Sequence, residues 1–440
     1  SNSFCTLLGG QMAPGHHESE PHRERQRGVV TKGDLRHIAR AALTAIGLRL
    51  LIGLVKSIAR FKLSSKLLWA LRDEVLGTDP WKWAAVFSGW ACFRPLFRTI
   101  EAVARPLLGD ALGEEAVRQG ATVAAGAIAA QPIRVMLMTT RTELALYLAS
   151  RASHSVAATF ILPRLPSPLC TFQHWDSFFV GLSAYQILYS LVFAPQAHSK
   201  AYVTFLNNCV LYPQQLWDTV AGFHRNSPVP AMLDYANAKG ITPVPTSTQD
   251  MKTLCHIMHP HTSSCDLHTL QWIARHLRQF SVPLYLPLKV MTTLAFSHRK
   301  VLRDPLGQAW KIVKAVVQSS MFLTLYCGLP MRMVCIFNQL GLRSGWLIGA
   351  VIGGICTLPP LLEPKSRRLD LALYCNMHAF RALVLMLVQR AVIPPPKGRH
   401  VMMLYTAAVT VLMWFLRFRP ADMHPNLRGA LGFIVGDASK

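Results

Sequence analysis

Residues 345–374 constrain the fold of this chain most, because they predict two apolar helices joined by a short basic turn. Gly345, Gly349 and Gly353 recur at every fourth position and share one helical face, which Gly354 borders. Glycine lets a neighbouring backbone approach closely, and in lipid such small-residue faces promote helix association. The segment therefore predicts a membrane hairpin that packs through its glycine face.

The turn of this hairpin combines helix-breaking prolines with cations. Prolines at 359, 360 and 364 lack the backbone N–H and clash with the preceding turn, so the first helix is expected to end there. Cations beside an apolar helix favour the head-group region of a bilayer. We therefore expect a basic loop at the membrane edge, made of Lys365, Arg367 and Arg368, with Arg141 in a related segment.

That related segment repeats the hairpin pattern earlier in the chain. One constant offset in sequence position aligns Gly126 with Gly353, Pro132 with Pro359, Arg141 with Arg368, and the Leu-Ala-Leu-Tyr run at 144–147 with the run at 371–374. Internal repeats are common in membrane folds. We interpret the pattern as a degenerate internal duplication; chance similarity between small apolar helices is the alternative.

The composition favours a membrane over an aqueous environment. Of the 440 residues, 51% are hydrophobic and only 15% are charged, against about 25% in a typical soluble domain. The net charge of +24 comes from basic residues scattered between apolar stretches, without a nucleic-acid-binding module. We expect the partner of this charge to be a bilayer with anionic head groups, and we expect no nucleic-acid partner.

The fold class predicted is all-α, a multi-pass helical membrane protein built from two related Tim-like helical-hairpin repeats. The predicted divisions are a disordered polar N-terminus (1–33), a first membrane half (34–223), a linker with a Cys/His-rich segment (224–266), a second membrane half (267–418) and a polar tail (419–440). Arg134 and Arg332 interrupt apolar segments at positions expected to lie deep in the bilayer, where burying an arginine costs free energy. They are therefore candidates for lining a water-filled cavity.

One short stretch concentrates residues that bind metals. The candidate ligands between positions 255 and 268 are Cys255, His256, His259, His261, Cys265 and His268. Thiolates and imidazoles suit a tetrahedral zinc ion, although this spacing matches no standard zinc finger. The alternatives are a packed loop whose Cys and His side chains satisfy backbone groups, or a single disulfide. No motif for nucleotide binding or nucleophilic catalysis accompanies the stretch, so we expect no enzyme activity.

The chain from Cys255 onward resembles the transmembrane protein 135 family, which is related to Tim-type translocase channels. The similarity is carried by Cys255, His259-Pro260 and Ser264-Cys265, then Pro283-Leu284-Tyr285-Leu286, then Lys365-Ser366-Arg367-Arg368 followed by Leu371-Ala372-Leu373-Tyr374. It covers about residues 255–415, and the first half matches weakly through the hairpin at 118–150. The resemblance implies a peroxisomal or mitochondrial multi-pass membrane protein linked to lipid metabolism and organelle dynamics.

The functional expectation is therefore a non-enzymatic organelle membrane protein that handles lipids, metabolites or polypeptides. Two alternatives remain open. The first is a structural accessory subunit of a larger mitochondrial inner-membrane complex, which would have membrane-protein partners. The second is a metal-dependent membrane enzyme that uses the Cys/His stretch.

Overall fold

The structure is a computed structural model, and it describes residues 30–61, 77–166, 172–225, 230–241, 252–341 and 345–436. Every regular element among these residues is helical, which confirms the all-α class. Four of the described helices are long and apolar enough to cross a membrane: Trp175–Phe193, Pro305–Phe337, Lys365–Gln389 and Gly398–Phe418. The chain divides into two compact units, which are Ser1–Thr171 with Pro396–Lys440, and Phe172–Pro395.

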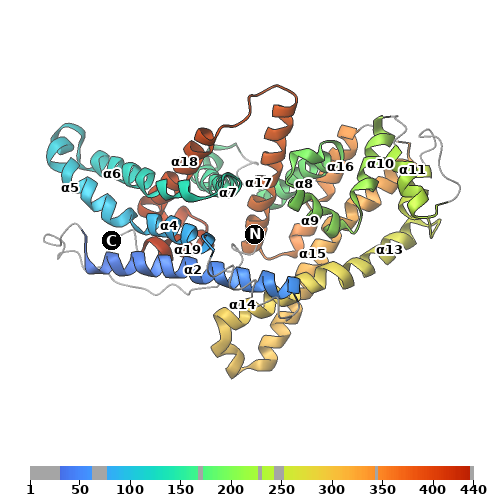
Figure 1. Ribbon diagram of the computed structural model, residues 1–440, viewed down its shortest axis with the longest axis horizontal. Helices are drawn as coiled ribbons and strands as arrows, with labels where there is room; N and C mark the ends of the chain where they lie inside the picture. The colour runs from blue at the N-terminus through green and yellow to red at the C-terminus, as the bar shows by residue number, and fades with distance from the viewer. Residues whose placement is uncertain are drawn as a thin grey trace. The chain divides into compact units, whose positions relative to one another are not determined.

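Unit 1 surrounds one hydrophobic core, to which residues from early in the chain, such as Ala41, and from late in the chain, such as Val435, both contribute. The helices that carry these two residues lie side by side (Figure 1). Its elements are α2 (Lys32–Phe61), α4 (Asp79–Ala91), α5 (Phe93–Leu112), α6 (Glu114–Ala129), η1 (Gln131–Val135), α7 (Met138–Val156), η2 (Ala157–Ile161), η3 (Leu162–Arg164), α18 (Gly398–Phe418), η7 (Pro420–Asp422) and α19 (Pro425–Val435). Phe87 stacks on Trp90 in the core, with ring centroids 5.6 Å apart. The Trp90 Nε1–H donates to the buried Tyr405 hydroxyl at 3.0 Å, which joins α4 to α18.

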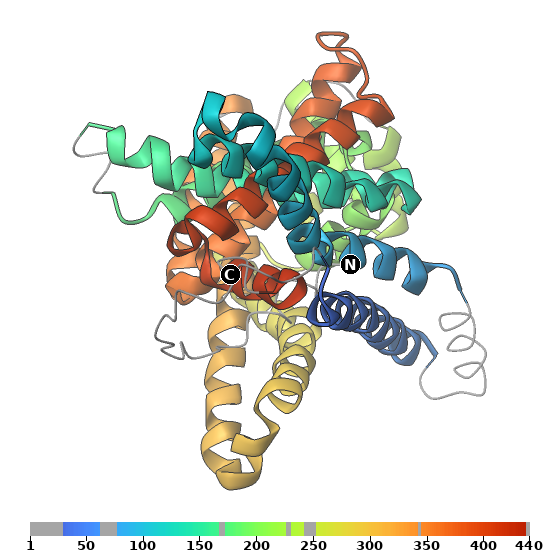
Figure 2. The same cartoon turned by 90° about the vertical axis from the view of Figure 1, so that its left-hand side faces the viewer.

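Unit 2 contains the other three candidate membrane spans. Its elements are α8 (Trp175–Phe193), η4 (Pro195–Ala197), α9 (Lys200–Val210), α10 (Gln214–Arg225), α11 (Pro230–Ala238), α12 (Lys252–Met258), α13 (Cys265–His276), η5 (Leu277–Ser281), α14 (Val282–Arg303), α15 (Pro305–Gln339), α16 (Gly345–Ile355), η6 (Pro359–Leu362) and α17 (Lys365–Gln389). Helices α14 and α15 form an antiparallel pair (Figure 2). Asp304 sets the start of α15, because its Oδ1 accepts the Gly307 N–H at 2.9 Å.

The two hairpins predicted from sequence have the same construction. In unit 1, α6, the short 3₁₀ helix η1 and α7 follow one another, and in unit 2, α16, η6 and α17 do so. Helices α7 and α17 begin at Met138 and Lys365, the same separation in sequence as that between Gly126 and Gly353. The proline-containing turns therefore break both hairpins at corresponding positions, as expected from the missing N–H of proline.

Corresponding arginines tie each turn to the helix that follows it. Arg141 donates to the backbone carbonyls seven and five residues before it, at 2.8 and 2.9 Å. Arg368 donates to the carbonyls seven and five residues before it, at 2.8 and 2.7 Å. Arg367 bonds to Glu363 at 2.9 Å and to Ser319 at 2.7 Å, whereas Lys365 is exposed. The arginines of the predicted basic loop thus hold the hairpin turns together, a role that composition did not indicate.

Glycines allow close helix packing in both hairpins. A Cβ at Gly126 would lie 3.0 Å from the Thr410 Cα of α18, and a Cβ at Gly353 would lie 2.9 Å from the Tyr185 Cβ of α8. The Tyr185 ring also covers Gly349. One other predicted packing position differs: Gly354 is exposed with no neighbour within 4 Å. Gly345 is the first residue of α16, and its packing stays a prediction.

Each hairpin packs against a candidate membrane span from the other half of the chain. Helix α18 packs on α6 and α7, and α8 packs on α16 and α17. The segments after these two spans also correspond: a single residue separates each span from a short 3₁₀ helix, η4 or η7, and an 11-residue helix, α9 or α19, comes next. The unit boundaries therefore differ from the predicted halves 34–223 and 267–418, because close packing with the hairpins assigns α8 to unit 2 and α18 to unit 1.

The predicted tail and linker also contain ordered structure. Residues 419–440 include α19, whose Leu427, Leu431 and Ile434 are buried in the core of unit 1, so this segment is not a simple polar tail. The predicted linker 224–266 includes α11 and α12. The predicted disordered segment 1–33 lies outside the described residues up to position 29, and α2 begins at Lys32.

Candidate metal centre

Two turns of the chain bring three predicted ligands together. Cys255 lies in the last turn of α12, and the His259 N–H donates to the Cys255 carbonyl at 2.9 Å as the helix ends. The Thr262 N–H then donates to the His259 carbonyl at 3.2 Å, which reverses the chain. Ser264 caps α13, because its hydroxyl accepts the Leu267 N–H at 3.3 Å, and this places Cys265 at the first position of the helix.

A fourth ligand comes from the candidate span α15. The Sγ atom of Cys335 joins those of Cys255 and Cys265 and the ring nitrogen of His259, and all four atoms lie within 4.8 Å of one another. His259 Nε2 lies 3.3 Å from Cys265 Sγ and 3.9 Å from Cys335 Sγ. A tetrahedral zinc ion with usual bond lengths would separate nitrogen from sulfur by about 3.6 Å. The four donors therefore have the type and spacing of a Cys₃His zinc site.

Hydrogen bonds orient the imidazole toward the thiols. His259 Nδ1 lies 2.8 Å from the Thr262 carbonyl, which can only accept, so Nδ1 carries the proton and the Nε2 lone pair is available to a metal. The His268 ring stacks on His259 at a centroid separation of 4.8 Å, and its Nε2 bonds to the Tyr212 hydroxyl at 2.9 Å. These contacts are those of an outer layer that fixes the ring of a metal ligand.

The electrostatics of the site favour a thiolate beside a histidine. The hydrogen bond from Cys335 lowers the pKa of Cys255 to about 4, with a further contribution from His259. The hydrogen bond to Cys255 in turn raises the pKa of His259. Burial raises the pKa of the Cys265 thiol, and burial also lowers the pKa of His268 to about 4. A metal ion would supply the positive charge that several thiolates at this distance require.

The six predicted ligands lie in three different kinds of position relative to the candidate centre. Cys255, His259 and Cys265 belong to the candidate centre, and His268 contacts it from outside. His256 and His261 are exposed and lie outside the four-residue group. Cys335 was not predicted, because it lies far beyond Cys265 in the chain, in an apolar helix where a lone cysteine is usually a small buried hydrophobe.

The two arginines predicted to line a cavity occupy different surroundings. Arg134 is exposed on η1. Arg332 lies one helical turn before Cys335 and pairs with Asp266 at 2.7 Å, beside the candidate centre. Asp266, the carboxylate next to Cys265 in the first turn of α13, is therefore held by an ion pair with Arg332.

A second buried group of possible ligands has a different character. Cys209, His276 and Cys327 lie close together, with the two Sγ atoms 3.3 Å apart. However, His276 Nε2 lies 2.6 Å from the Cys209 carbonyl and Nδ1 lies 2.9 Å from the Thr324 hydroxyl. Both ring nitrogens already have partners, as expected for a core histidine, so this group is the weaker metal candidate.

Comparisons with known proteins give no relative: no family model, no curated protein and no solved structure matches the chain.

Proposed function

We propose that the protein is a non-catalytic, multi-pass organelle membrane protein that handles lipids, metabolites or polypeptides, and that it arose by internal duplication. The observation that carries the proposal is the matched pair of hairpins, each held by an equivalent arginine and packed through an equivalent glycine on a candidate span. Paired repeats around membrane spans are the usual construction of transport proteins, in which the repeats provide the surfaces that a solute contacts.

The duplication would also include the segment that follows each hairpin, and these two segments would have exchanged places, so that each packs with the other hairpin. The segment from α8 to α9 follows the first hairpin but packs with the second, and the segment from α18 to α19 does the reverse. The residues after α8 and α18 have nearly the same backbone, with φ/ψ of −150°/56° at Ala194 and −140°/55° at Arg419. Such agreement in irregular geometry supports common ancestry more strongly than shared helicity does.

Zinc is proposed as a structural cofactor of unit 2. The four donors come from α12, from the turn after it, from α13 and from the span α15, so one ion would join a short surface helix pair to a membrane helix. Four protein ligands leave no position for water or substrate, which is typical of structural rather than catalytic zinc. This arrangement favours the non-catalytic proposal over a metal-dependent membrane enzyme.

The peroxisomal or mitochondrial location rests on the resemblance to the transmembrane protein 135 family. The basic surface expected from a net charge of +24 is compatible with membranes that expose anionic head groups. Fractionation of cells that express the tagged full chain would test the location. A signal confined to other membranes would contradict the location.

The proposed activity is testable in liposomes that contain the purified full chain. We expect faster transbilayer movement of a fluorescent phospholipid, or faster efflux of a small anionic dye, than in protein-free liposomes. Dithionite quenching measures the first and dye dequenching the second. If carbonate at high pH extracts the protein from membranes, the membrane proposal fails. If inserted protein moves neither probe and migrates only in a large native assembly, the accessory-subunit alternative replaces the handling function.

A further inference from the structure

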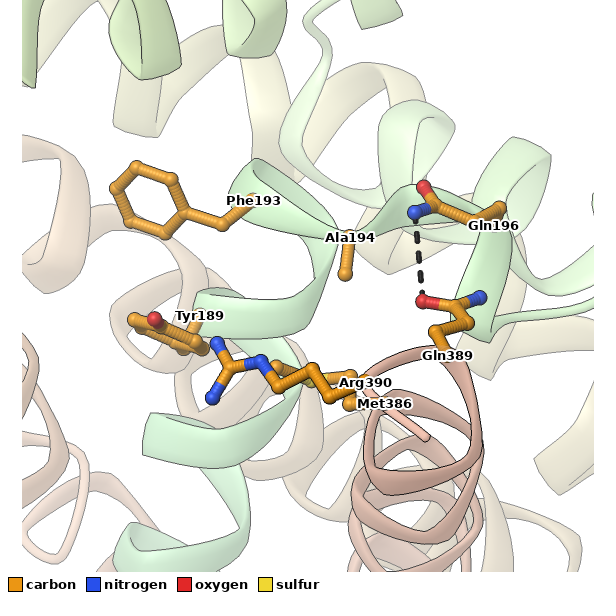
Figure 3. A pocket seen from close by; sticks show the side chains of 7 residues that line it. All are labelled: Tyr189, Phe193, Ala194, Gln196, Met386, Gln389 and Arg390. Atoms are coloured by element: carbon orange, nitrogen blue, oxygen red, sulfur yellow. Dashed lines mark hydrogen bonds between the residues drawn. The ribbon is translucent and has the colours of Figure 1, made fainter. Parts of the chain in front are cut away.

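A cavity of about 490 Å³ opens in unit 2 where α8 and α17 end (Figure 3). Its size lies within the range of small-ligand pockets. Tyr189, Phe193 and Met386 supply apolar walls, and Gln196, Gln389 and Arg390 supply polar groups. Figure 3 shows these side chains, from two helix ends and the turn η4, around one common opening.

The position of the cavity sets the environment of a ligand. Phe193 and Gln389 are the last residues of two candidate membrane spans, so the cavity lies at the depth where hydrocarbon gives way to head groups. The apolar walls reach from these ends about one helical turn inward: Tyr189 lies one turn before Phe193, with ring centroids 5.0 Å apart, and Met386 lies three residues before Gln389. A ligand here would meet apolar carbon on the span side and polar groups at the rim.

The polar groups at the rim of the cavity are available to bind a ligand. Arg390 is exposed and forms no ion pair within the described part of the chain. The Gln196 amide donates to the Gln389 Oε1 at 3.4 Å, which leaves the Gln389 amide N–H groups for another acceptor. A guanidinium and amide donors at a membrane edge suit an anionic oxygen, such as a phosphate or carboxylate.

In unit 1 the residue that directly follows the span has aromatic contacts. Arg419 directly follows its span as Ala194 does, with nearly the same backbone angles, and its guanidinium lies over the Phe160 ring at 5.5 Å. Phe160 in turn packs against Trp414 of α18 at a centroid separation of 6.4 Å. In unit 2 the equivalent residue is the buried Ala194, which lines the cavity. The residue that directly follows the span therefore differs in size and in its contacts between the two units.

We propose that this cavity binds an anionic amphiphile: Arg390 and Gln389 contact its phosphate or carboxylate, and its first chain carbons lie against Tyr189, Phe193 and Met386. The inference names a ligand class for the proposed handling of lipids or metabolites, and in that respect it rests on the proposed function. Equilibrium binding in detergent requires no transport, so failure to bind and failure to move a probe across liposomes are separate results.

The test uses the purified full chain in detergent, with phosphatidic acid, phosphatidylcholine and inorganic phosphate as probes. Native mass spectrometry measures lipid binding, and titration calorimetry measures phosphate binding. We expect phosphatidic acid to bind at least about tenfold more tightly than phosphatidylcholine, the factor that one charge-assisted hydrogen bond supplies. Inorganic phosphate should bind far more weakly, because it lacks the apolar chain.

Three variants locate the binding. Arg390→Gln should remove most of the preference for phosphatidic acid, whereas Arg303→Gln, which changes an exposed arginine in the last turn of α14, should leave it intact. Ala194→Phe should weaken binding of both lipids by filling the cavity. Equal binding of inorganic phosphate would make the cavity a site for free anions and overturn the amphiphile proposal. An unchanged preference in folded Arg390→Gln protein would overturn the site itself.

Discussion

Replacing Cys335 by serine removes the one candidate zinc ligand that is distant in sequence. The other three ligands lie within residues 255–265, whereas a metal bond to Cys335 closes the long loop between positions 265 and 335. Treated as a cross-link, closure of such a loop is worth about 4 kcal/mol in chain entropy. Since each kcal/mol shifts the unfolding midpoint by about 2–4 °C in a unit of this size, we expect Cys335→Ser to lower it by about 8–16 °C.

The assay combines metal analysis with thermal unfolding of the purified full chain. Wild-type protein should retain about one zinc per chain after dialysis, as a closed four-ligand site does, and Cys335→Ser should lose most of it. Removing zinc from the wild type with a strong chelator should lower the midpoint by a similar amount. The variant and the wild type are compared at one detergent concentration, because bound amphiphiles also change apparent stability.

Two control variants make the prediction specific. His261→Ala changes an exposed histidine beside the ligands, and Cys356→Ser changes a buried cysteine of unit 2 that lies outside the four-residue group. Both should keep the zinc, although Cys356→Ser should lose some stability through burial of a hydroxyl. The reasoning is refuted if Cys335→Ser keeps wild-type zinc, or if His261→Ala loses as much zinc as Cys335→Ser does.

Three further predictions concern packing, turns and pH. Gly353→Leu should destabilise the protein by about 1–3 kcal/mol through overpacking, whereas Gly354→Leu, with open space around it, should have little effect in the same denaturation experiment. Arg141→Gln and Arg368→Gln should cost similar amounts, about 1–2 kcal/mol each, because each loses two charge-assisted bonds to turn carbonyls; clearly unequal losses would argue against equivalent turns. Burial, with a smaller contribution from the charge of Arg381, lowers the pKa of His198 to about 4. The unfolded chain then binds a proton at this side chain that the folded chain does not bind, so His198 should contribute a fall of up to about 3 kcal/mol in the free energy of unfolding between pH 6.5 and pH 4, beside the contribution of His268. A His198→Gln variant whose stability falls as much as that of the wild type would contradict this origin.

The sequence by itself determined the elements that depend on local chemistry. Proline placement and the spacing of glycines predicted the glycine-faced helix and the turn of the hairpin at 345–374, and the constant offset between the two hairpins matched the starts of α7 and α17. Length and apolar composition are enough to identify a candidate span such as Trp175–Phe193. These features are local because a helix is defined by hydrogen bonds between residues four apart and by a period of 3.6 residues.

Only the tertiary structure decided which helices and which distant side chains meet. Periodicity shows that Gly126 and Gly353 lie on packing faces, but α8 and α18 are both apolar, so it does not show which span covers which hairpin. Cys335 became a candidate ligand only when α15 packed beside α13, and the cavity is lined by residues from α8, η4 and α17 that lie far apart in the chain. Contacts between residues far apart in the chain depend on packing of complementary surfaces, which no local pattern specifies.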